Sequence, residues 1–272
     1  MALTLHRHSS SLKQELTVKA VILAGGYGTR LSEESHLRPK PMIEIGGMPL
    51  LWHIMKIYSH HGINDFIICC GYKGYMIKEY FANYLLHMSD VTIDLSSSTF
   101  KTHRNMAEPW RVTLVDTGMN VGTGGRLKRI SHYLDGPFCM TYGDGVSNVN
   151  ILKLVKFHQQ AKTLATVTGI LPAAKFGILS TQHNLVTDFE EKPKKDPSGW
   201  INAGFFVLEP GVLKHIESDE TFFEHKPLRN LAKEKELAIF KHHDFWMCMD
   251  TLRDRNNLEK MWQDGSAPWK IW

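Results

Sequence analysis

The chain of 272 residues has few cysteines, no long apolar run and no dense block of one charge. Cys69, Cys70, Cys139 and Cys248 have neither metal-ligand nor disulfide-framework spacing, so we expect free thiols in a reducing, cytoplasmic environment. No stretch reaches the roughly 18 to 20 apolar residues of a membrane helix. Lys and Arg number 32 against 28 Asp and Glu, too small an excess to indicate nucleic-acid binding. We therefore expect a soluble protein without nucleic-acid or membrane partners.

What is present is the patterning of one α/β domain, over residues 18–272, preceded by a disordered extension at residues 1–17. A targeting segment is the less favoured interpretation of that extension. Strands are expected at 19–24, 65–71 and 137–144, and helices at 49–58, 75–88 and 148–160. Their alternation predicts βαβ units, interrupted by a β-rich insertion at 89–120. The remainder suggests strands at 164–170, 176–180, 186–190 and 203–208, and a final helix at 250–262.

A glycine-rich turn follows the first expected strand and is the most informative segment, Leu23-Ala24-Gly25-Gly26-Tyr27-Gly28-Thr29-Arg30. Glycines let the backbone approach a ligand, and exposed N–H groups after a strand bind phosphate oxygens. The dinucleotide-binding pattern is excluded because Leu31 stands where a third glycine is needed. A P-loop is excluded because the segment has no Gly-Lys-Ser/Thr. Arg30 and Lys40 suit a triphosphate. The alternative is a structural turn beside a solvated cationic loop.

These residues, with Lys40, resemble the signature of the sugar-1-phosphate nucleotidyltransferases. Within that family, the similarity is greatest to the branch that transfers a cytidylyl group. It is carried by residues 40–47, 52–55, 71–74, 123–129, 141–145 and 249–253, and it runs from Lys19 to Trp272. Met48 and the pair Val121-Gly122 depart from the family pattern. The resemblance implies a Rossmann-like fold of the glycosyltransferase-A type, with a mixed, mostly parallel sheet flanked by helices and a C-terminal sugar-binding portion.

The resemblance also implies a reaction, in which glucose 1-phosphate attacks the α-phosphorus of CTP to give CDP-glucose and pyrophosphate. The phosphate nucleophile is already an anion at neutral pH, so none of the 15 histidines is assigned as a base. In the family this product feeds dideoxysugar synthesis for surface polysaccharide. A transferase using dTTP or UTP, and a non-catalytic nucleotide-binding homologue, remain alternatives. Family members form homo-oligomers, commonly hexamers, and the 89–120 insertion is a plausible packing arm.

The site residues follow from the same resemblance. Mg²⁺ is expected on Asp144 and Asp250, although a glycine-flanked turn and a helix N-cap are their ordinary roles. The catalytic cations are Arg30, Lys40 and Lys192. The nucleotide is assigned to residues 23–30, Lys40, Val121, Thr123, Arg126 and Gly143, with the segment 121–126 expected to read the base. The sugar phosphate is assigned to Tyr142, Gly177, Glu191, Lys192, Asn202 and Gly204.

Overall fold

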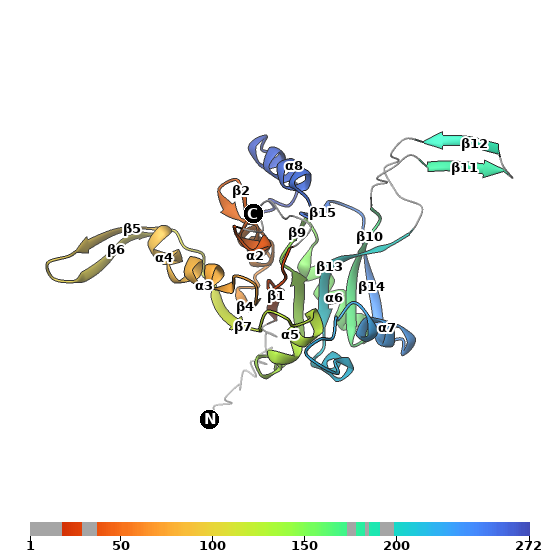
Figure 1. The fold of residues 1–272 in the computed structure, drawn as a ribbon, viewed down its shortest axis with the longest axis horizontal. Helices are drawn as coiled ribbons and strands as arrows, with labels where there is room; N and C mark the ends of the chain where they lie inside the picture. Colours follow the sequence, from red (N-terminus) through yellow and green to blue (C-terminus); the bar gives the residue numbers. More distant parts are fainter. Residues whose placement is uncertain (1–17, 29–36, 173–177, 183–184, 191–198) are drawn as a thin grey trace, which may run out of the picture.

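A seven-stranded sheet forms the centre of the computed structural model, which describes residues 18–28, 37–172, 178–182, 185–190 and 199–272 (Figure 1). Its strand order is β14-β10-β13-β8-β1-β4-β7. The strands are β1 (Lys19–Leu23), β4 (Asp65–Cys70), β7 (Arg111–Asp116), β8 (Phe138–Tyr142), β10 (Ala165–Ile170), β13 (Ile201–Leu208) and β14 (Leu237–His242).

The sheet is mixed and mostly parallel, which confirms the predicted fold class. Strands β8, β1, β4 and β7 run parallel to one another, and β10 runs parallel to β14, whereas β13 is antiparallel to both β8 and β10. The carboxyl ends of β1, β4 and β8 therefore meet at one edge of the sheet. In parallel sheets this edge is where ligands bind.

Helices cover both faces of the sheet, and the sheet separates the core into two apolar clusters. Alternate residues of each strand enter opposite clusters, so Cys70 lies in the first and Cys69 in the second, both as free thiols. The first cluster includes side chains of α2 (Leu50–His60), α6 (Ile151–Ala161) and α8 (Leu252–Gln263). The second includes those of α5 (Thr123–Arg129), the 3-10 helix η4 (Pro210–His215) and α7 (Lys226–Lys233).

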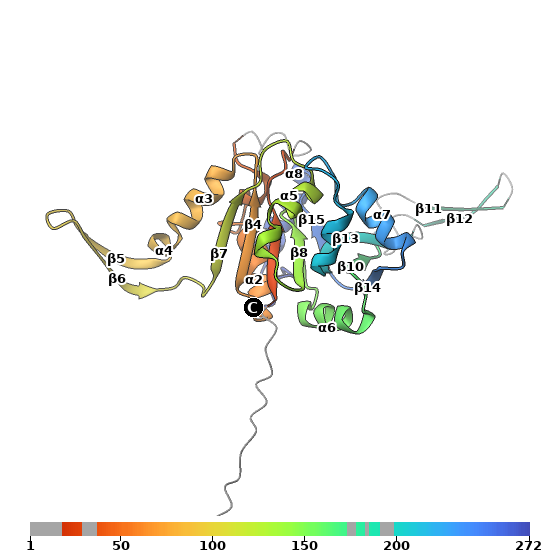
Figure 2. The same ribbon diagram turned by 90° about the horizontal axis from the view of Figure 1, so that it is seen from below.

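The segment after β4 departs from its prediction in two ways. The single helix expected over 75–88 is two helices, α3 (Gly74–Ala82) and α4 (Tyr84–His87), separated at Asn83. The expected insertion at 89–120 contains a hairpin, β5 (Ser89–Asp94) and β6 (Thr99–Asn105), but β7 at its end belongs to the central sheet. The hairpin projects away from that sheet (Figures 1 and 2). A second hairpin, β11 (Ile178–Gln182) and β12 (Leu185–Glu190), follows β10.

Short elements connect the sheet edge to the rest of the chain. They are the 3-10 helices η2 (Lys40–Met42) and η3 (Ser131–Tyr133), the pair β2 (Glu44–Ile45) and β3 (Met48–Pro49), and the pair β9 (Gly145–Ser147) and β15 (Trp246–Cys248). The expected disorder of residues 1–17 lies outside the described residues. Within the part of the chain that the structure describes, no helix is both long and apolar enough to span a membrane.

Candidate active site

The glycine turn leaves the carboxyl end of β1, where its backbone is tied to the neighbouring strands. The N–H of Ala24 donates to the carbonyl of Cys69 at 3.0 Å, and the carbonyl of Leu23 accepts from the N–H of Gly143 at 3.0 Å. Gly28 has a φ of +64°, a backbone conformation that favours glycine. Gly26 and Tyr27 are the more exposed residues of the turn. The turn thus lies at the edge of the sheet where ligands bind in parallel α/β folds, and its binding of phosphate stays a prediction.

Arg126 lies against the buried side of this turn. Its Nη2 donates to the carbonyl of Gly25 at 2.9 Å, while Nη1 donates to Oγ1 of Thr117 at 2.7 Å and to the carbonyl of Gly118 at 2.8 Å. Burial lowers the pKa of this guanidinium, and its side chain is almost wholly enclosed. Arg126 therefore joins the glycine turn to the 117–119 segment. Its direct contact with a nucleotide stays a prediction.

The two aspartates predicted to bind metal lie side by side because β9 pairs with β15. Asp144 directly precedes β9, and Asp250 follows β15 two residues after Cys248. The antiparallel register places Gly145 opposite Cys248, and the N–H of Met249 donates to the carbonyl of Asp144 at 2.8 Å. Residues far apart in the sequence thus reach one point at the end of β8.

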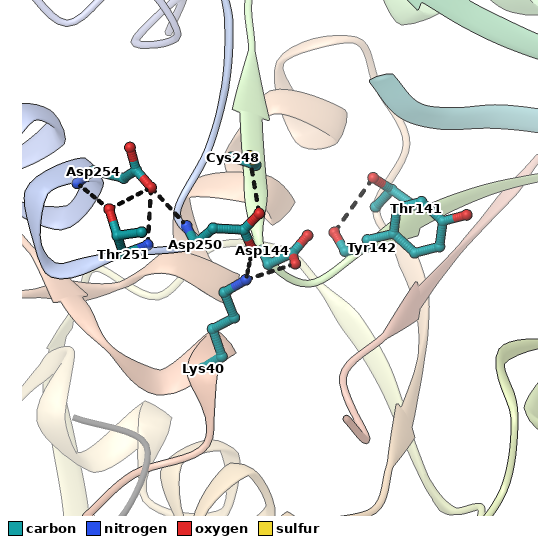
Figure 3. A network of polar contacts seen from close by, with 8 residues as sticks. All are labelled: Lys40, Thr141, Tyr142, Asp144, Cys248, Asp250, Thr251 and Asp254. Carbon is teal, nitrogen blue, oxygen red and sulfur yellow. Dashed lines mark hydrogen bonds and ion pairs between the residues drawn. The ribbon is translucent and has the colours of Figure 1, made fainter. Parts of the chain in front are cut away.

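Lys40 completes the cluster (Figure 3). Its Nζ lies 2.8 Å from Oδ2 of Asp144 and 2.6 Å from Oδ1 of Asp250. Burial by itself lowers the pKa of Lys40, but the two carboxylates outweigh burial and raise it above its ordinary value. Lys40 is therefore protonated at neutral pH and bridges both aspartates.

The same arrangement fits a divalent metal ion. Both carboxylates direct an oxygen toward one point, and Mg²⁺ is usually held by one or two carboxylates together with waters and substrate phosphates. Among the described residues no group of three or more His, Cys, Asp and Glu side chains has the arrangement of a metal site, so waters and substrate phosphates would complete the coordination. Burial and the nearby carboxylates of Asp250 and Asp144 raise the pKa of Cys248 to about 11, which keeps this neighbouring thiol protonated.

A small pocket opens beside Asp144 and contains three of the residues predicted to bind the sugar phosphate, Tyr142, Asn202 and Gly204. Gly204 has a φ of +77°, and a Cβ there would stand 2.5 Å from the Tyr142 ring. The Oδ1 of Asn202 accepts from the N–H of Gly204 at 2.7 Å. Burial, and the nearby carboxylate of Glu224, raise the pKa of Tyr142. The pocket is therefore lined by uncharged side chains apart from the carboxylate of Asp144.

Sequence reasoning missed Trp246, which lines this pocket and donates from Nε1 to the carbonyl of Ala203 at 2.6 Å. A signal was present, because Trp246, Cys248 and Asp250 alternate along an apolar run and alternate residues of a strand share a face.

Glu224 was also missed by sequence reasoning. Its Oε2 accepts a hydrogen bond of 2.5 Å from Oγ1 of Thr123, which in turn accepts from the N–H of Phe223. No motif in the sequence indicates this contact.

The glycines expected to help read the base have a packing role. The N–H groups of Gly122 and Gly124 donate to the carbonyls of Asp219 and Thr221, at 2.8 and 2.9 Å. A Cβ on Gly125 would lie 2.0 Å from the carbonyl oxygen of Asp219. These glycines therefore allow the chain around residue 220 to pack directly on the start of α5, and base recognition by residues 121–126 stays a prediction.

The remaining predicted site residues are not placed. Thr29, Arg30, Gly177, Glu191 and Lys192 lie outside the described residues. The structure thus brings together Lys40, both aspartates, the start of the glycine turn and part of the sugar pocket.

The fold and site together define a mixed α/β protein with a glycine turn, a lysine and a carboxylate pair at the carboxyl edge of its sheet. The solved structure of HddC from Yersinia pseudotuberculosis has the same fold, with a TM-score of 0.65 and 22% identity, over 90% of this chain and 99% of that one. A profile of the nucleotidyl transferase family matches residues 19–264. The chain belongs to this family.

Two relatives are similar along their whole length. The chain is 56% identical over 257 residues to the glucose-1-phosphate cytidylyltransferase of Salmonella typhi, a match that covers 94% of this chain and 100% of the relative. It is 44% identical over 257 residues, with the same coverage, to the probable glucose-1-phosphate cytidylyltransferase of Bacillus subtilis. These matches agree with the cytidylyl branch named by the sequence resemblance.

Proposed function

We propose that the protein transfers a cytidylyl group from CTP to glucose 1-phosphate, forming CDP-glucose and pyrophosphate. The observation that carries this proposal is the 56% identity to a glucose-1-phosphate cytidylyltransferase over that relative's full length. The geometry agrees, because a glycine turn, a buried lysine and two carboxylates meet at the edge of the sheet where ligands bind.

The proposed mechanism needs alignment and charge neutralisation more than proton transfer. The second phosphate pKa of about 6 leaves the sugar phosphate an anion at neutral pH, so its oxygen attacks without a general base. One P–O bond forms at the α-phosphorus as the bond to pyrophosphate breaks in line. Holding two anions in this geometry is the main task of the site.

Each group of residues has a part in this proposal. The backbone of residues 24–28 would cradle the triphosphate, and Lys40, with Arg30, would bind its oxygens. The pocket beside Tyr142 would receive the glucose ring, with Lys192 as anchor for its phosphate. Mg²⁺, held by Asp144 and Asp250, would offset charge on the α-phosphate.

Pyrophosphate release tests the proposal directly. Purified protein is incubated with Mg²⁺, glucose 1-phosphate and either CTP, UTP or dTTP, and initial rates are compared. We expect kcat/KM for CTP to exceed that for UTP and dTTP by about 10²-fold, because uracil and thymine present an acceptor where cytosine presents an amino donor. Equal rates with UTP or dTTP would contradict the choice of base. A folded protein that releases no pyrophosphate from any of them would be a nucleotide-binding homologue.

We propose further that the chain forms a homo-oligomer, with six copies implied by the family resemblance, and that the β5–β6 hairpin is a contact arm. The hairpin projects from the domain (Figure 2). Three of its large apolar side chains are at least half exposed in the single chain, namely Ile93 at 54%, Leu95 at 87% and Phe100 at 51%. Apolar side chains gathered on a projecting element are typical of a protein contact.

A further inference from the structure

Lys40 stands where the proposed metal ion would bind. Its ammonium contacts both carboxylates at 2.8 and 2.6 Å, and its side chain is 9% exposed. We propose that Lys40 occupies the metal position in the nucleotide-free protein, and that a metal ion enters only together with a nucleotide, whose phosphates take over the ammonium. This inference rests on the proposed function, because it takes Asp144 and Asp250 to be the metal ligands.

The two carboxylates need a cation whether or not a nucleotide is present. Asp144 and Asp250 are both partly buried and close together, so their negative charges repel. The backbone of Lys40 is fixed between Pro39 and Pro41, and Met42 and Ile43 anchor the following residues in the core. The Pro41 ring packs against Gly143, where a Cβ would stand 2.8 Å from its Cγ. The lysine backbone is therefore held beside the aspartates, while its side chain has rotatable bonds through which the ammonium can change partners.

A free metal ion is a poor competitor for this position. To bind both carboxylates it would have to displace the ammonium, and a buried ammonium left without an anion beside a divalent cation is strongly unfavourable. A nucleotide changes this balance, because its phosphate oxygens are good acceptors for a lysine ammonium. Lys40 would then exchange the carboxylates for phosphate oxygens, and Asp144 and Asp250 would hold the metal ion. Metal and nucleotide binding are coupled through this one side chain.

The test measures metal binding without any nucleotide. Mn²⁺ is titrated into the protein and free Mn²⁺ is followed by electron paramagnetic resonance. We expect Lys40→Met to bind Mn²⁺ at least about tenfold more tightly than the unmodified protein, since the competing ammonium is gone. Lys153→Met, on the exposed surface of α6, is the matched control and should bind like the unmodified protein.

A double variant locates the effect. Adding Asp144→Asn to Lys40→Met removes one proposed ligand and should abolish the gain in Mn²⁺ affinity. Equal Mn²⁺ affinities of Lys40→Met and the unmodified protein would overturn the proposal, as would a gain that persists in the double variant.

Thermal unfolding supplies a second measurement, and one half of it uses only the unmodified protein. Without nucleotide, Mn²⁺ should leave the Tm of the unmodified protein unchanged and should raise that of Lys40→Met. A saturating rise in the Tm of the unmodified protein at micromolar Mn²⁺ would overturn the proposal. Neither measurement uses CTP or a sugar phosphate. The proposed transferase activity is tested separately by the pyrophosphate assay, so the failure of one proposal can be told from the failure of the other.

Discussion

A single buried guanidinium supports the glycine turn after β1. Besides the carbonyls of Gly25 and Gly118, Arg126 donates to the carbonyls of Cys70 and Met119, both at 3.2 Å. Position 25 has no room for a side chain, because a Cβ there would stand 2.1 Å from Nη1 of Arg126. The glycine is thus explained by packing on the buried side of the turn.

This contact predicts different effects for two adjacent glycines. Gly25→Ala should lower the free energy of unfolding by about 1–3 kcal/mol, because the methyl group displaces a buried, fully bonded side chain. Gly26→Ala is the matched control, since nothing lies within 4 Å of a Cβ at that position, and its effect should stay within about 0.5 kcal/mol. Urea denaturation measures both. A Gly25→Ala protein as stable as the Gly26→Ala protein would contradict this account of the turn.

The carboxylate pair gives a prediction about activity. Asp250→Asn removes one negative charge from the proposed metal site while keeping the shape of the side chain. We expect kcat/KM for CTP and glucose 1-phosphate to fall by about 10²-fold or more, because an electrostatic contact to the reacting phosphate is weakened. Asp264→Asn, exposed at the end of α8, should react at the unmodified rate. Initial-rate measurements over a range of Mg²⁺ concentrations compare them, and full activity of Asp250→Asn would exclude this aspartate as a ligand.

Among the elements, helix α2 depends on a buried histidine. His53 Nε2 contacts the carbonyl of Ile45 at 2.8 Å, and Trp269 Nε1 donates to its Nδ1 at 3.4 Å. The ring of Trp262 lies edge-on at 4.7 Å. His53 therefore connects α2 to the β2–β3 turn and to the C-terminal residues. Burial lowers the pKa of His53 from 6.5 to about 4, so the folded protein holds it neutral.

This histidine predicts a loss of stability in acid. Because the unfolded chain binds a proton near pH 6.5 and the folded chain only near pH 4, stability falls as the pH drops through this window. When the pH has fallen below about 4, this difference in the pKa of His53 lowers the free energy of unfolding by about 3 kcal/mol. His53→Gln, although less stable at neutral pH, should lose less stability between pH 7.5 and pH 4. Urea denaturation at several pH values measures the difference, and parallel pH profiles for the two proteins would show that His53 is not its source.

Element prediction succeeded where the pattern is local. The apolar runs followed by glycine correctly predicted β1, β4 and β8, and the helical spacing before Gly62 correctly predicted α2. Strand β14 was missed. It lies at an edge of the sheet, parallel to β10, and each of its two faces carries two apolar residues and one polar residue, so its sequence has neither a clear alternation nor an apolar run along its whole length. The division between α3 and α4 at Asn83 was missed too, because apolar residues continue through it.

At the scale of the whole molecule, the β5–β6 hairpin projects away from the central sheet (Figures 1 and 2). Replacing Ile93, Leu95 and Phe100 by serine should lower the oligomer mass while leaving the domain folded, because these side chains are exposed in the single chain. Sedimentation equilibrium measures the mass, and circular dichroism checks the fold. The control is Leu152→Ser, at an exposed position on α6. An unchanged mass for the triple variant would exclude these side chains from the contact.

The sequence by itself determined the fold class, the family resemblance and the types of side chain in the site, because short-range periodicity and compact motifs are written in neighbouring residues. Only the tertiary structure decided which of these side chains meet. Asp144 and Asp250 are joined by the β9–β15 pairing, and Lys40 reaches both from a separate turn. Arg126 matched a nucleotide-binding motif, yet its guanidinium lies in the interior beside Gly25. Pairing across strands and the loss of water around a charge depend on residues distant in the chain, which no local pattern specifies.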